Sequence, residues 1–179
     1  MTVERTLPPD LHPDTLAVRV AIERSQYGEN SEALYLTTGF VQPGSATSAV
    51  RFQSGEGYTY ARTSNPTVTA FERRLAALEG TEAAIGAASG MGAILMMIMG
   101  LLKSGDHVIL SRSMFGSTLN LFAKEFGKFG VETTFVSQTD VAEWRAAVKP
   151  NTKLLFAETP TNPLTEVCDI AALASVAHD

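Results

Sequence analysis

The sequence predicts an α/β protein built on a mostly parallel sheet, and two observations support this. From Asn65 onward, strand-like and helix-like segments alternate along the chain. Strand-like segments are expected at 83–88, 107–110, 131–136 and 153–157, and most of them contain an uninterrupted run of apolar residues. Such strands are typical of parallel sheets whose two faces are both covered by helices.

The helices expected between these strands have recognisable ends. A helix over 66–78 begins after the capping residue Asn65 and ends at Gly80. Its apolar stripe consists of Val68, Phe71, Leu75 and Leu78. Further helices are predicted after the Ser89-Gly90 turn, over 116–129, over 141–148 behind Asp140, and after Asp169. Ahead of Gly57 one helix is predicted over 15–26, and residues 34–57 are expected to be irregular and to wrap onto another surface.

Composition excludes several classes of function. The 179 residues are 45% hydrophobic and 18% charged, as in an ordinary soluble globular protein, and the net charge of -5 argues against nucleic-acid binding. The single Cys168 cannot form an internal disulfide, so a cytoplasmic location is expected. Three scattered histidines and one cysteine match no metal-site spacing. The uncharged stretch 83–102 is long enough to cross a bilayer, but its glycines favour a strand, a turn and a buried helix, so no membrane is expected.

Four segments carry groups suited to binding a ligand. Ser89 to Gly92 opens a helix, where free N–H groups and the helix dipole attract anions. Tyr60 and Arg62, two residues apart in an extended chain, are expected to project to one side and to suit a phosphate. The segments 112–118 and 158–163 each follow a predicted strand, at the edge where open α/β sheets bind ligands.

Each segment also has a purely structural interpretation. Gly90 can serve a turn, Arg62 can be a solvated surface residue, Phe115 can belong to the core, and Asn162 can be a turn residue before a proline. Their shared placement at the carboxyl ends of strands makes the binding interpretation stronger for the set than for any one member.

Four motifs resemble one known family in order and spacing: YARTSNPT, LEGTEAAIGAASGMGAI, SGDHVILSRSMFGST and ETPTNPL. The sequence is similar, from about Leu34 to its end, to the Cys/Met-metabolism enzymes that depend on pyridoxal 5'-phosphate (PLP). The resemblance implies the PLP-dependent transferase fold of type I, which is aspartate aminotransferase-like, with helices on both faces of the sheet and present here in truncated form. It also implies an N-terminal arm and helix over 1–57 that contacts a neighbouring subunit, and over 58–179 the first part of the large PLP-binding domain.

The resemblance assigns roles to individual residues. Gly90 and Met91 would give backbone N–H groups to the PLP phosphate, and Phe115 would lie against the pyridine ring. Asn162 would hydrogen-bond the phenolic oxygen of the ring, with Glu158 close behind. Many relatives carry tyrosine where Phe115 stands, so a proton-transfer role borrowed from that hydroxyl is in doubt.

The resemblance also places part of the site on a second subunit. Tyr60 and Arg62 would reach the phosphate of the neighbour's cofactor, which implies a homotetramer built from dimers with shared active sites. The lysine that forms the Schiff base and the aspartate that pairs with the pyridine nitrogen are expected beyond Asp179, so no catalytic residue is assigned within the chain.

The activity implied for the complete protein is γ-replacement on an activated homoserine ester, a small amino-acid substrate. The motifs SRSMFGST and FAETPTNPLTEVCDI are most similar to members that use O-succinylhomoserine and sulfide in methionine biosynthesis. The alternatives are cystathionine γ-synthase or γ-lyase chemistry, or a non-catalytic oligomerising protein that retains the fold.

Overall fold

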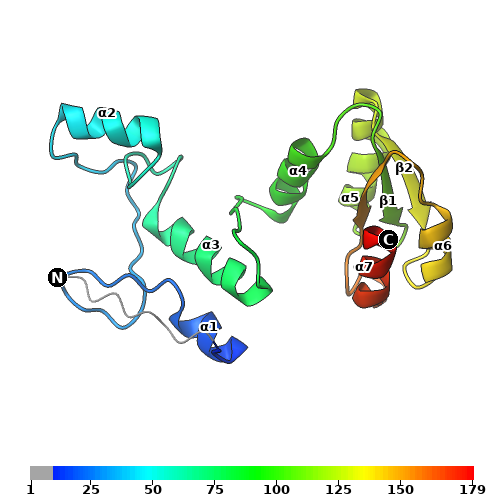
Figure 1. The fold of residues 1–179 in the computed structure, drawn as a ribbon, viewed down its shortest axis with the longest axis horizontal. Helices are drawn as coiled ribbons and strands as arrows, with labels where there is room; N and C mark the ends of the chain where they lie inside the picture. The colour runs from blue at the N-terminus through cyan, green and yellow to red at the C-terminus, as the bar shows by residue number, and fades with distance from the viewer. Residues whose placement is uncertain (1–9) are drawn as a thin grey trace. The chain divides into compact units, whose positions relative to one another are not determined.

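A three-stranded parallel sheet lies at the centre of the part of the chain from Ala87 to Asp179. The computed structural model describes residues 10–179, and its strands are β1 (His107–Ser111), β2 (Glu132–Val136) and β3 (Thr152–Phe156), in the order β2-β1-β3 (Figure 1). Leu110 of β1 pairs with Phe135 on one side and with Phe156 on the other. These three predicted strands are therefore confirmed, each to within one residue at either end.

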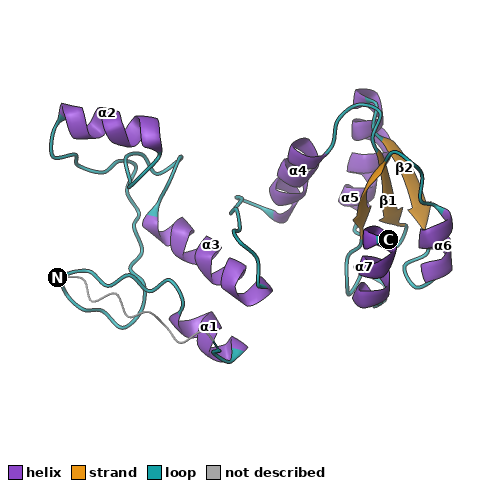
Figure 2. Ribbon diagram, in the orientation of Figure 1, coloured by secondary structure: helices purple, strands orange, loops and turns teal. Residues whose placement is uncertain are grey.

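Helices cover both faces of this sheet, as predicted (Figure 2). Val108 and Leu110 share one apolar cluster with Ile98, whereas Ile109 between them faces a second cluster that contains Trp144. The first face is covered by α4 (Gly90–Leu101), α5 (Gly116–Asn120), the π-helical turn η1 (Leu121–Glu125) and the 3-10 turn η2 (Phe126–Phe129). The second face is covered by α6 (Val141–Ala146) and α7 (Ile170–His178). Because β1 contacts both clusters, all five of its residues are buried.

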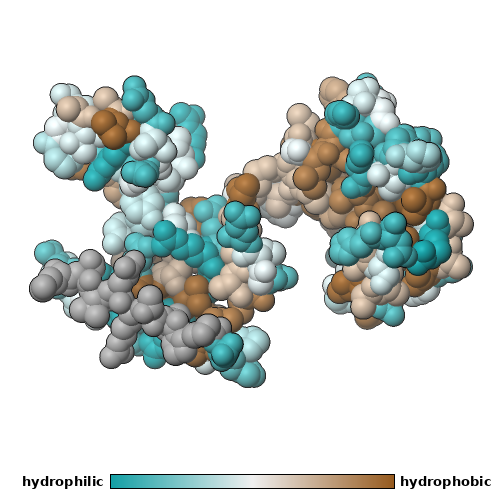
Figure 3. All heavy atoms as spheres, in the orientation of Figure 1, coloured by the Kyte–Doolittle hydropathy of each residue, from teal (hydrophilic) through white to brown (hydrophobic). Residues whose placement is uncertain are grey.

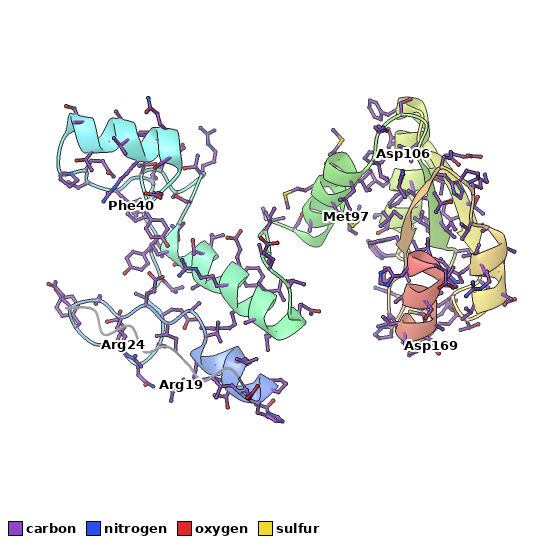
Figure 4. All side chains as sticks on the ribbon, viewed as in Figure 1. Arg19, Arg24, Phe40, Met97, Asp106 and Asp169 are labelled. Atoms are coloured by element: carbon purple, nitrogen blue, oxygen red, sulfur yellow. The ribbon has the colours of Figure 1, made fainter. Side chains whose placement is uncertain are left out.

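Polar side chains fix where these helices begin. Asp140 accepts hydrogen bonds from the amides at the start of α6, and Asp169 accepts one from Ala172 at 3.0 Å at the start of α7. Figure 4 labels Asp169 at this position. Each cap satisfies an N–H group that has no partner within its own helix. Both predicted caps are confirmed.

The part of the chain up to Gly86 forms a separate compact unit. Its described helices are α1 (Pro13–Arg19), α2 (Ser45–Ser54) and α3 (Pro66–Glu79). Asn65 caps α3 by accepting from the Thr67 amide at 2.8 Å, and Gly80 ends it in the left-handed region at φ 66°. The division between residues 1–57 and 58–179 is a functional one and stays a prediction.

The segment before α3 is held against it by one arginine. The Arg74 guanidinium donates to both carboxylate oxygens of Glu32, at 2.8 and 3.0 Å, and to the Val20 carbonyl. Side chains of this pair are mostly buried, so the bidentate geometry is protected from solvent. The segment therefore does wrap onto another element, as its apolar residues suggested.

Three predictions on local structure were wrong. The helix expected over 15–26 ends at Arg19, because Val20 is extended and its carbonyl turns to Arg74. Residues 45–54 form α2 inside the segment expected to be irregular; none of its residues is buried, which explains why no apolar period marks it. The strand expected over 83–88 is absent: Gly86 donates to Glu72 at 2.7 Å, and within the described chain no strand lies beside it to complete a ladder.

The apolar stripe predicted on α3 exists, but it is not buried in this chain. Val68, Phe71, Leu75 and Leu78 are all more than a third exposed, with Phe71 at 56%, whereas the buried residues of α3 are Ala70 and Ala76. Figure 3 shows hydrophobic surface on this unit among hydrophilic residues. The 3.6-residue period therefore predicted the helix correctly without predicting what it packs on.

The stretch 83–102, which the sequence marks as uncharged, forms a loop followed by α4. Among residues 10–179, no helix has both the length and the apolar character needed to span a bilayer.

A buried histidine at the start of β1 connects all three strands. His107 is fully buried, and its two ring nitrogens lie 2.8 Å from the hydroxyls of Thr152 on β3 and Thr134 on β2. Burial lowers the pKa of His107, the Lys149 charge lowers it further, and the Glu132 charge opposes them. Folding therefore favours the neutral imidazole.

We expect acid to destabilise the protein through this residue. Below about pH 6.5 the unfolded imidazole binds a proton that the folded one resists. The unfolding free energy therefore decreases as the pH is lowered, by at most about 1.4 kcal/mol per pH unit. Urea unfolding at pH 8 and pH 5.5 measures this, with His107→Gln as the variant without a titrating group. Equal pH dependence in the two proteins would contradict the assignment.

Candidate functional site

Three loops meet at the carboxyl edge of the sheet. They follow β1 at 112–115, β2 at 137–140 and β3 at 157–163. Since the strands are parallel and adjacent, these loops leave the sheet along the same edge. The predicted site residues Phe115, Glu158 and Asn162 all lie on them.

Glu158 ties two of these loops together. One carboxylate oxygen accepts a hydrogen bond from the Phe115 amide at 3.1 Å, and the other accepts from the Asn162 amide at 3.2 Å. A carboxylate that accepts from two backbone N–H groups makes stronger bonds than a neutral acceptor would. Glu158 was predicted only to lie near a ligand, whereas the structure shows it joining the loops that carry the other two residues.

The third loop joins the same group through Gln138, which the sequence analysis missed. This side chain is 2% exposed, and its amide nitrogen donates to the Glu158 carbonyl at 2.8 Å. The available signal was its position two residues past a strand that ends at the same edge. A glutamine there is predicted to be an ordinary loop residue, because nothing in its local sequence indicates that it is buried.

The start of α4 adds a set of free backbone donors. Ser89 accepts from the Gly92 amide at 3.1 Å, which leaves the amides of Gly90 and Met91 without a protein acceptor in the described chain. A Cβ built on Gly90 meets no heavy atom within 4 Å, so neither packing nor backbone strain explains a glycine there. The open space in front of two unpaired N–H groups suits an anion.

A contact from α5 places this cup beside the sheet edge. The Thr118 hydroxyl lies 3.7 Å from the Met91 sulfur, and Thr118 is in the first turn after Phe115. The structure therefore brings five of the predicted residues into one connected group: Gly90, Met91, Phe115, Glu158 and Asn162.

Two side chains of this group remain available to a ligand. Phe115 is 45% exposed, which is unusual for a ring so close to the core residue Met114. The Asn162 side chain is exposed. Its backbone N–H donates to Glu158, but its side-chain amide forms no hydrogen bond within the described residues. A flat ring and a polar oxygen are the chemical partners that these two side chains favour.

The arginine at this edge is already engaged. Arg112 forms an ion pair with Glu143 of α6 and donates to the Phe135 carbonyl at 3.0 Å. The pKa of Glu143 is lowered, first by a hydrogen bond from the Ser137 amide and then by Arg112. Arg112 thus supports the loops after β1 and β2 and is not free to bind an anion.

Tyr60 and Arg62 lie close together in the unit that ends at Gly86. The Arg62 guanidinium carbon sits 5.0 Å from the centre of the Tyr60 ring, a cation–π contact that restricts both groups. An extended chain was predicted to bring the two side chains together, but the structure shows a turn. Tyr60 bridges to Gly39, and the chain then turns, with the Thr63 and Ser64 amides donating to the Tyr60 carbonyl.

Metal ligands are a further kind of site to consider. Among residues 10–179, no three His, Cys, Asp or Glu side chains gather closely enough to hold a metal ion.

Comparison with known proteins identifies the family. The model of the Cys/Met metabolism PLP-dependent enzymes matches residues 14–179. The chain belongs to this family. O-Succinylhomoserine sulfhydrylase of Pseudomonas aeruginosa is 54% identical over 167 residues, which are 92% of this chain and 41% of the relative. L-Methionine gamma-lyase of Fusobacterium nucleatum subsp. polymorphum is 38% identical over 92% of this chain and 42% of the relative.

Solved structures agree on the fold. MetB from Corynebacterium glutamicum superposes with a TM-score of 0.83 at 36% identity, over 94% of this chain and 42% of that one. A Campylobacter jejuni protein that carries N'-pyridoxyl-lysine-5'-monophosphate gives 0.84 at 30% identity, with the same coverage. This confirms the truncated PLP-dependent α/β fold predicted from the sequence. The chain spans about two fifths of the length of the relatives it matches.

The residues present fit PLP, the cofactor of this family. The phosphate matches the two unpaired N–H groups of Gly90 and Met91, beside which a Cβ built on Gly90 meets no heavy atom within 4 Å. The exposed Phe115 ring suits stacking on the pyridine ring. The side-chain amide of Asn162, which has no partner in the described chain, suits a hydrogen bond to the phenolic oxygen.

A charge placed at the cup tests whether it binds an anion. Asp and Asn both cap helices well, so Ser89→Asp and Ser89→Asn should melt at similar temperatures. We expect only Ser89→Asp to weaken PLP binding, by about tenfold or more, because its carboxylate repels the phosphate. Titration of PLP into the two apo proteins at full length measures this. Equal PLP affinity would show that the phosphate binds elsewhere.

Proposed function

We propose that the intact protein is a PLP-dependent sulfhydrylase of methionine biosynthesis. It would perform γ-replacement on O-succinylhomoserine, with sulfide as the incoming nucleophile and homocysteine and succinate as products. The observation that carries the proposal is the 54% identity to a relative named O-succinylhomoserine sulfhydrylase, over a stretch that includes every residue of the sheet-edge group.

In this proposal the sheet edge and the α4 cup hold the cofactor. The amides of Gly90 and Met91 donate to the phosphate, while Phe115 stacks on the ring and Asn162 donates to the phenolic oxygen. Glu158 keeps Phe115 and Asn162 in register, because one carboxylate accepts from both amides. Bound PLP supplies the electron sink that γ-replacement needs. The chain's own contribution is therefore orientation of the ring.

The Phe115 ring adds no proton donor to this arrangement. The Phe115 ring would exclude water from one face of the pyridine ring of PLP, and other groups would move the protons. The loops at the sheet edge, 112–115, 137–140 and 157–163, contain no lysine, and Lys149 is paired with Glu132. None of these loops therefore supplies an amine for the Schiff base.

Tyr60 and Arg62 are proposed to complete the site of a neighbouring subunit. The cation–π contact holds the guanidinium in place before it meets a phosphate, so less freedom is lost on binding. This proposal includes a cytoplasmic homotetramer built from dimers with shared active sites, in which residues 1–57 form an arm on the neighbour.

Product analysis decides the reaction. The intact protein should release homocysteine and succinate from O-succinylhomoserine and sulfide. Cystathionine from cysteine without homocysteine from sulfide would favour a cystathionine γ-synthase. Thiol release from methionine would favour the γ-lyase activity named for the 38% identical relatives. No turnover of any of these substrates would favour the non-catalytic oligomerising alternative.

Removing the arginine tests the phosphate contact from the neighbour. We expect Arg62→Ala to weaken PLP retention by roughly ten- to hundredfold, since a phosphate loses a charged hydrogen-bond donor. Arg62→Lys keeps the charge without the forked geometry, so its PLP retention should fall between those of the other two proteins. Equilibrium dialysis followed by cofactor absorbance measures retention. Unchanged retention in Arg62→Ala counts against the assignment.

A further inference from the structure

Gln138 is a buried side chain with one end bonded and the other unpaired. It is 2% exposed, and its Nε2 donates to the Glu158 carbonyl at 2.8 Å. Its Oε1 is fully buried and has no hydrogen-bond partner among residues 10–179. A buried acceptor without a donor is unfavourable for stability, and native proteins contain few of them.

Gln138 therefore contributes to stability only through its Nε2 bond, and the unpaired Oε1 offsets part of that contribution. A methionine of nearly the same length would remove the unpaired oxygen but would leave the Glu158 carbonyl without its donor. What the glutamine adds is a single bond from the loop after β2 to the backbone of the loop after β3. The acceptor of that bond belongs to Glu158, whose side chain binds the amides of Phe115 and Asn162.

The hydrogen bonds form a continuous chain of contacts. Gln138 holds the carbonyl of Glu158, and the Glu158 carboxylate accepts from the amides of Phe115 and Asn162 at 3.1 and 3.2 Å. The Glu158 side chain starts from a backbone that Gln138 fixes. Movement of this backbone would therefore shift both amides relative to each other and to the α4 cup.

We propose that Gln138 is a positioning residue of the PLP site, which acts through Glu158 to set the placement of Phe115 and Asn162. The inference rests on the proposed cofactor-binding role of this edge. It does not depend on which amino acid the enzyme converts.

The first test is Gln138→Met in the full-length protein. Loss of the hydrogen bond should raise the dissociation constant of PLP from the apo protein about fivefold. The melting temperature of the apo protein should change by only a few degrees, because the variant removes the unpaired oxygen but also takes the donor from the Glu158 carbonyl. A lowered melting temperature with unchanged PLP affinity would mean that Gln138 is structural only, and would overturn the proposal.

A matched control lies on β2, the strand that precedes the loop of Gln138. Thr133 of β2 carries the other buried side-chain oxygen without a partner in the described chain, and it contacts none of the sheet-edge loops through a hydrogen bond. Thr133→Val should leave the PLP dissociation constant as it is. An equal rise in both variants would show that any buried change on β2 loosens the site, and that result also overturns the proposal.

A double-mutant cycle tests the route through Glu158. In Glu158→Gln one of the two accepting oxygens becomes an NH2 group, which is a donor and cannot bind the Phe115 or Asn162 N–H that it faces. This variant should therefore weaken PLP binding by itself. If Gln138 acts through Glu158, the double variant should bind PLP no more weakly than Glu158→Gln alone. Fully additive losses overturn the route. Gln138→Leu, which also lacks the donor and carries no charge into this buried position, replaces Gln138→Met in the cycle if that variant does not fold.

These measurements separate the inference from the proposed function. PLP affinity and coupling are measured on apo protein, whereas the substrate is decided by product analysis. A coupled loss of PLP affinity in a protein that makes no homocysteine would reject the substrate and keep Gln138 as a positioning residue.

Discussion

Parallel pairing of β1 with both of its neighbours is the constraint on which the second unit depends. Because β1 lies between β2 and β3, its backbone groups are engaged on both sides and its side chains enter two apolar clusters. Parallel direction then brings three chain segments, far apart in sequence, to a single edge. Phe115, Gln138 and Glu158 come together for this reason, although 43 residues separate the first and last.

The sheet could be predicted from sequence because its signals are local and agree with one another. Asp140 and Asp169 mark helix starts through their own side chains, and 108–110 is continuously apolar. The misplaced elements depend on partners distant in the chain. The helix at 15–26 stops because the Val20 carbonyl meets Arg74, 54 residues later, and no local pattern contains that contact.

The site shows the same division. Positions 90, 91, 115, 158 and 162 could be named from motifs, because motif order preserves which residues line a site. The connections between them could not be named. The link from Gln138 to the Glu158 carbonyl involves a backbone atom, which leaves no mark on residue identity, and burial of Gln138 follows only once β2 and β3 are placed. Tyr60 and Arg62 were correctly expected to lie together, but a turn and a cation–π contact hold them there.

The unpaired main-chain donors at the start of α4 bear on how this family can diverge. If Gly90 and Met91 hold the cofactor through N–H groups, selection acts on the bulk of the side chain at 90 and on packing against Thr118 at 91. Neither requirement specifies a functional group. Substitutions at position 91 that keep this packing could therefore accumulate over evolutionary time without loss of the cofactor, whereas a larger side chain at position 90 would stand in the open space beside the two N–H groups. Similarity at this motif accordingly reports the shape of the cup more than the chemistry performed in front of it.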